Sequence, residues 1–97
     1  MSNGKLFSEL EAKQIGDAIG ILWDKVDLNE FAMGLSVELE HGSHDPETNV
    51  IHDNYEMAGK IAWAHLKEMR DYYSRLKVME EEGEAYWKSV DKKGNSN

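Results

Sequence analysis

The chain has 97 residues, near the lower end of the length at which one hydrophobic core supports a fold, so we expect a single domain. It contains no cysteine, which excludes a disulfide framework, a thiolate zinc site and a thiol nucleophile. Lys and Arg number 11 against 19 Asp and Glu, and the resulting net charge of −8 argues against direct binding to nucleic acid.

The N-terminal stretch Met1–Lys5 lacks the apolar run of a signal peptide, and no segment approaches the roughly 18 apolar residues of a membrane span. We therefore expect a soluble, cytoplasmic protein without a membrane partner. The patterning predicts a flexible leader over residues 1–7, a single helical domain over 8–90 and a disordered tail over 91–97.

Two N-capping signals predict the first two helices. Ser8-Glu9-Leu10-Glu11 has the form of a capping box, and the helix that it begins is expected to end at Gly20. Asp27 as N-cap, with Glu30 at the third helical position, predicts a second helix through about His41. The segment from Ser43 to His52, which carries the only proline, is predicted to be a loop.

Asp53-Asn54-Tyr55-Glu56 resembles a third capping box, and it predicts the longest helix, running to about Glu80 or Glu82. We expect Gly83 to interrupt this helix and residues 84–87 to form one further turn. The apolar stripe of the long helix is predicted to comprise Met57, Ile61, Ala64, Tyr72, Leu76 and Met79. The fold class is thus all-α, a small bundle of three main helices plus a short C-terminal helical turn.

A carboxylate and an imidazole lie three residues apart in two places, Glu38 with His41 and His65 with Glu68. Each pair can present an oxygen and a nitrogen on one side of a helix, and antiparallel packing would bring all four side chains together. Such a site suits a divalent metal such as Fe, Mn or Zn. The leading hypothesis is a metal-binding helical domain, non-catalytic or of unknown activity, and whether the protein is an enzyme stays open.

Two structural alternatives account for the same residues. His65 and Glu68 can form a buried hydrogen-bonded pair, or Glu38 and His65 can make a single interhelical contact that fixes the register of two helices. The second functional hypothesis, from a different class, is an acidic protein-interaction module that binds a protein partner with a basic surface or mimics DNA.

The segments E-L-E-H-G at residues 38–42 and H-L-K-E-M-R-D-Y-Y at 65–73 resemble a small uncharacterised domain family of bacterial and bacteriophage proteins, over roughly residues 9–77. The resemblance implies a compact helical domain and carries no established activity. Similar sequences often have proline at the position of Arg70, so helix three is expected to be more continuous here. In bacteriophages, small acidic proteins of this kind often inhibit a host protein, which supports the interaction hypothesis.

Overall fold

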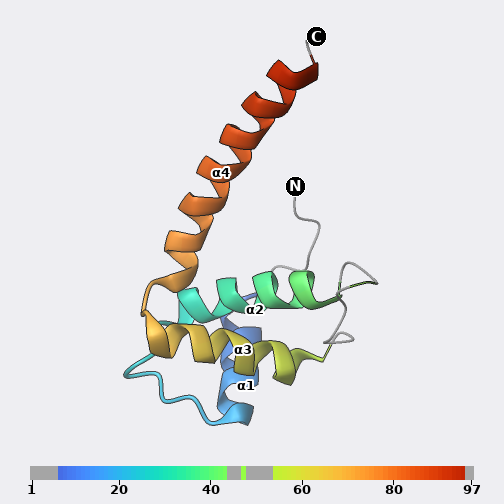
Figure 1. Cartoon of the computed structure of the whole chain (residues 1–97). Helices are drawn as coiled ribbons and strands as arrows, with labels where there is room; N and C mark the ends of the chain where they lie inside the picture. The colour runs from blue at the N-terminus through green and yellow to red at the C-terminus, as the bar shows by residue number, and fades with distance from the viewer. Residues whose placement is uncertain (1–6, 44–46, 48–53, 96–97) are drawn as a thin grey trace.

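The computed structural model describes residues 7–43, 47 and 54–95, and the side chains of all of these except 41–43 and 93–95. Within those ranges the chain is helical and contains no strand, so the predicted all-α class is confirmed. The described residues form four helices, rather than three and a short turn: α1 (Glu9–Ile19), α2 (Leu28–Ser43), α3 (Tyr55–Glu68) and α4 (Tyr72–Asn95) (Figure 1).

The predicted caps begin the helices at or within one residue of their expected places. Ser8 and Glu11 form the complete capping box of α1, and Gly20 ends that helix in the left-handed conformation at φ 96°. The Asp27 carboxylate accepts the backbone N–H of Glu30 at 2.9 Å and so caps α2. Asn54 caps α3 by accepting the N–H of Met57, one residue later than the sequence indicated, and Asp53 lies outside the described residues.

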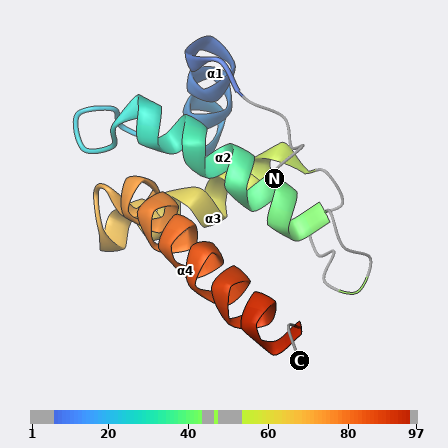
Figure 2. The same cartoon turned by 90° about the horizontal axis from the view of Figure 1, so that it is seen from above.

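The core lies where α1, α2 and α3 meet. Helices α2 and α3 pack side by side and α1 runs across them (Figures 1 and 2). The side of α3 that faces the core carries the small residues Ala58, Gly59 and Ala62, which let the helices approach closely. The buried apolar residues are Ala12, Ile21, Val26, Phe31, Leu35, Leu39, Ala58, Ala62, Leu66 and Tyr73.

The predicted long third helix is wrong in two respects. The chain leaves the helical conformation at Met69, whose φ of −155° and ψ of 118° are extended, and it starts α4 at Tyr72. Helix α4 then continues through Gly83 to Asn95, so it includes residues 91–95 of the segment that the sequence assigned to a tail. The absence of proline at residue 70 therefore does not keep the helix continuous.

The predicted stripe of the long helix is also misplaced. Met57 and Met79, expected in the core, are 47% and 57% exposed, whereas the buried residues of α3 are Ala58, Gly59, Ala62 and Leu66. Among the described residues, no helix is both long enough and apolar enough to cross a membrane.

Candidate functional site

Tyr73 is the residue at which α2, α3 and α4 meet, and only 1% of it is exposed. Its hydroxyl donates a hydrogen bond to Glu38 Oε2 at 2.7 Å. The Nδ1 atom of His65 lies 2.9 Å from the same hydroxyl and 3.1 Å from Glu38 Oε2. A carboxylate, a phenol and an imidazole from three helices thus form one polar cluster, which we call the Tyr73 cluster.

The hydroxyl of Tyr73 donates its proton to Glu38. The contact of His65 Nδ1 with Glu38 Oε2 is a hydrogen bond in the tautomer that carries a proton on Nδ1. Burial, and then the hydrogen bond to Glu38, raise the pKa of Tyr73 far above its ordinary value. Tyr73 therefore stays a neutral hydrogen-bond donor at physiological pH.

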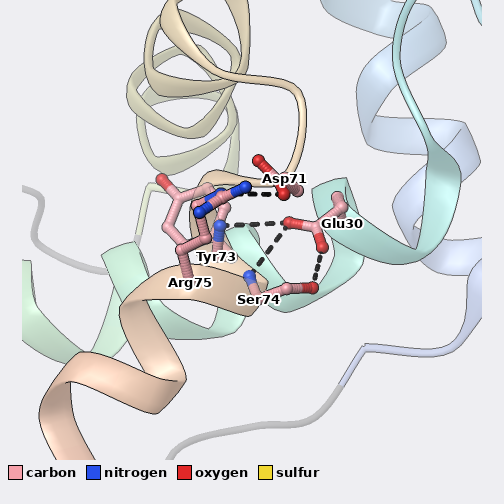
Figure 3. Close-up of polar contacts among 5 residues, drawn as sticks. All are labelled: Glu30, Asp71, Tyr73, Ser74 and Arg75. Carbon is pink, nitrogen blue, oxygen red and sulfur yellow. Dashed lines mark hydrogen bonds and ion pairs between the residues drawn. The ribbon is translucent and has the colours of Figure 1, made fainter.

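Glu30 holds the other end of Tyr73. Its Oε1 accepts the backbone N–H groups of Tyr73 at 3.0 Å and of Ser74 at 3.2 Å, and its Oε2 accepts the hydroxyl of Ser74 (Figure 3). These are the second and third residues of α4, whose N–H groups have no partner within the helix. A glutamate of α2 therefore caps α4, and its negative charge lies at the positive end of the helix dipole.

A glycine lies between the two glutamates. Glu30, Gly34 and Glu38 are spaced four residues apart, so they follow one face of α2. A Cβ atom at Gly34 would lie 2.5 Å from Cε2 of the Tyr73 ring. Gly34 thus makes room for the ring while the two carboxylates bind its backbone and its hydroxyl.

The structure brings two of the four predicted metal ligands together. Glu38 and His65 are in direct contact, which is the interhelical contact that the sequence left as an alternative, whereas Glu68 is exposed at the end of α3. His41 lies on α2, but its side chain is outside the described part. Among the side chains that are described, no three His, Asp or Glu residues are grouped as they would be to hold a metal. The metal site stays a prediction.

Two residues were not singled out from the sequence: Tyr73 of the Tyr73 cluster, and Glu30, which binds its backbone N–H. Tyr73 entered only as part of the segment at 65–73, and Glu30 only as the third helical residue after Asp27. The spacing Glu30-Gly34-Glu38 could have pointed to Glu30 and Tyr73. A small residue between two acids on one helical face indicates that a neighbouring polar group approaches the helix closely there.

The second half of α4 is a different kind of feature. It extends away from the three-helix body (Figures 1 and 2), and every residue from 84 to 92 is exposed. Large apolar side chains are exposed there and in the turns just before it: Met79 by 57%, Tyr86 by 60%, Trp87 by 60% and Val90 by 37%. Because so much aromatic and aliphatic surface is rarely left open on one helix, this surface is a candidate interface.

Comparison of the chain with known proteins shows which family it belongs to and assigns no activity. No curated protein and no solved structure matches the chain significantly. A family model described as "Protein of unknown function (DUF5661)" matches residues 12–82, which take in most of α1, all of α2 and α3, and the first half of α4. The match spans well over half of the chain, so the protein belongs to the DUF5661 family, an uncharacterised family.

Proposed function

We propose that the protein is an interaction module that pairs with a second copy of itself through the part of α4 from Met79 to Val90. The observation that carries this proposal is a stripe on α4 formed by Met79, Gly83, Tyr86 and Val90, in which the three large side chains are exposed; we call it the α4 stripe. Its members recur at alternating spacings of four and three residues, which is the pattern of a helix that packs along another helix.

The projecting part of α4 would gain stability from such a cover. Its residues 84–92 are all exposed, and most helical stability in proteins comes from the packing of an apolar face rather than from intrinsic propensity. Pairing would bury the stripe and so stabilise the helical conformation that the chain adopts there. The apolar surface supplies the driving force.

The charges of α4 indicate the direction of pairing. Glu81, Glu82 and Glu84 precede the centre of the projecting half, and Lys88 and Lys92 follow it, with Asp91 between them. A parallel pair would place glutamates beside glutamates, whereas an antiparallel pair places the acidic segment of each helix beside the basic segment of the other. Opposite charges thus favour the antiparallel arrangement over the parallel one.

The sizes of the stripe residues fit the same arrangement. An antiparallel pair that sets Gly83 opposite Tyr86 of the second copy also sets Met79 opposite Val90. A Cβ atom at Gly83 would meet nothing within 4 Å, so there is open space beside this glycine for an incoming ring. Small and large residues then alternate across the seam, as they do in well-packed helical pairs.

The Tyr73 cluster has a clear part in this function. Glu30 caps α4, and Glu38 and His65 bind the hydroxyl of Tyr73, so the first turn of α4 is attached to both α2 and α3. Because a helix is stiff over a few turns, this attachment sets the direction in which the stripe projects. The bundle therefore acts as a rigid base that presents one helix.

Sedimentation equilibrium between about 5 and 500 µM tests the proposal. An interface of a few helical turns on each side is small, so we expect a dissociation constant in the micromolar range. Val90→Ser should weaken the dimer about tenfold or more, since it removes an apolar residue from the seam. Val78→Ser is the matched control, because Val78 is exposed on α4 but lies outside the stripe.

The contrary results are equally specific. A wild-type chain that stays monomeric throughout this range overturns the proposal, and so does a dimer that Val90→Ser and Val78→Ser weaken equally. Circular dichroism of each variant shows that the bundle is still folded. Raising the salt concentration should weaken the wild-type dimer, since part of the attraction is between exposed charges.

A further inference from the structure

A pocket of about 330 Å³ lies between the connector that follows α1 and the C-terminal end of α3. Figure 1 shows the connector passing from α1 to the start of α2 beside that end of α3. Leu22, Trp63 and Leu66 provide apolar walls, and Leu22 is 70% exposed although it is a leucine. The volume falls in the range of small-molecule sites.

Three cationic side chains surround this pocket: Lys25 from the connector, and Lys67 and Arg70 from the end of α3. The ammonium group of Lys67 lies 4.3 Å from the centre of the Trp63 ring, a cation–π contact that holds it at the rim. None of the three has a carboxylate within ion-pair distance among the described residues. In a chain of net charge −8, three cations that line one pocket and form no ion pair with another described residue are an unusual concentration of positive charge.

The helix dipole explains part of this arrangement. Lys67 and Arg70 lie at the negative end of α3, where cations are favourable. That explanation does not extend to Lys25, which belongs to no helix, or to the exposed Leu22 beside it. An apolar hollow with a rim of cations is the usual complement of a molecule that has an apolar body and an anionic group.

We propose that this pocket binds a small amphiphilic anion, a molecule with an apolar body that contacts Leu22, Trp63 and Leu66 and a carboxylate, sulfonate or phosphate group held by Lys25, Lys67 and Arg70. The proposal is independent of α4 pairing, because the pocket and the α4 stripe share no residue. Ligand binding and self-association can therefore be measured separately.

Two dyes of the same shape test the proposal. 8-Anilinonaphthalene-1-sulfonate and N-phenyl-1-naphthylamine share an aromatic body, and only the first carries an anionic group. We expect saturable binding of one anilinonaphthalenesulfonate per chain, with competition by decanoate. The double variant Lys67→Gln and Arg70→Gln should weaken this dye about tenfold and leave the affinity for the neutral dye nearly unchanged.

The matched control is Lys77→Gln with Lys88→Gln, which makes the same change in net charge at exposed positions on α4. Leu22→Ser should weaken both dyes, since it removes a wall that both contact. In the wild-type chain, rising salt should weaken the anionic dye and not the neutral one, a measurement that needs no variant. Shifts of the backbone amide signals should fall on residues 20–26 and 63–70.

Three results would overturn the proposal. The first is the absence of saturable binding to the wild-type chain. The second is an equal loss of the anionic dye in the pocket variant and in the α4 control. The third is amide shifts confined to residues 84–92, which would place the dye on the exposed aromatic residues of α4 instead.

Discussion

Glu30 Oε1 accepts the backbone N–H of Tyr73 at 3.0 Å, across 43 residues of sequence. This bond joins the first turn of α2 to the first turn of α4, and the same oxygen also accepts the N–H of Ser74. A long-range side chain thus does what a neighbouring N-cap residue does in most helices. The position of α4 depends on it, so it is the first contact to remove.

Glu30→Ala should lower the free energy of unfolding by about 2–3 kcal/mol, because it leaves two helix N–H groups without their acceptor in a buried place. Glu30→Gln should cost less, since one oxygen acceptor is retained. Glu56→Ala is the control, because Glu56 is an exposed acid in the first turn of α3. Urea denaturation measures all three, and equal losses for Glu30→Ala and Glu56→Ala would refute the role of the cap.

Gly34→Ala and Gly83→Ala should have opposite effects. A Cβ atom at Gly34 would lie 2.5 Å from the Tyr73 ring and 3.0 Å from Cβ of Ala62, so alanine should destabilise the bundle by about 1–3 kcal/mol despite its higher helix propensity. At Gly83 nothing lies within 4 Å, and alanine should raise the stability of α4 by up to about 1 kcal/mol. Thermal unfolding followed by circular dichroism distinguishes them. Similar melting temperatures for the two variants would contradict the close packing of Tyr73 on Gly34.

Tyr73→Phe should lower the free energy of unfolding by about 1–3 kcal/mol at neutral pH, because Glu38 and His65 lose the hydroxyl between them. The raised pKa of Tyr73 makes this difference dependent on pH. The unfolded chain releases the tyrosine proton near pH 10 and the folded chain retains it, so the contribution is complete below that pH and falls above it.

The difference between wild type and Tyr73→Phe should therefore be constant up to about pH 9 and narrow by about 1.4 kcal/mol per pH unit above pH 10. Urea denaturation at pH 7, 9 and 10.5 provides the comparison. Two stability curves that stay parallel across this range would show that the hydroxyl of Tyr73 ionises as readily in the folded chain as in the unfolded one.

The metal site predicted from Glu38, His41, His65 and Glu68 has a test of its own. It predicts near-stoichiometric Fe, Mn or Zn by plasma mass spectrometry of untagged protein, loss of that metal in His65→Ala, and a lower melting temperature in chelator. Protein that gains no metal on reconstitution and melts at the same temperature with chelator would contradict it.

Local signals in the sequence were sufficient for the starts of the first two helices and the end of the first, and they placed the start of the third within one residue. The capping box at Ser8, the N-cap at Asp27 and the glycine at residue 20 each act through residues within one turn, so spacing alone reveals them. The contact of Glu38 with His65 was also foreseen, as one of two structural alternatives.

The break between α3 and α4 at residues 69–71 could not be predicted from such local signals. The segment Lys67–Tyr72 has neither glycine nor proline, and local propensity therefore favours a continuous helix. The helix stops because Tyr73 packs on Gly34 and because Glu30 supplies the cap for the next helix, and both partners are some 40 residues away in sequence. Glu30 itself was assigned to a local capping box at the start of α2. The sequence does not show whether its carboxylate will bind the N-terminus of α2 or that of α4.

Paramagnetic relaxation tests the antiparallel pairing of α4 most directly. The chain has no cysteine, so Lys92→Cys carries a single nitroxide label, and the labelled protein is mixed with unlabelled chains enriched in ¹⁵N. Antiparallel pairing predicts broadening of the amide signals of residues 77–81 in the second copy. Broadening at residues 90–95 instead, as in a parallel pair, or no broadening at about 500 µM protein, would contradict it.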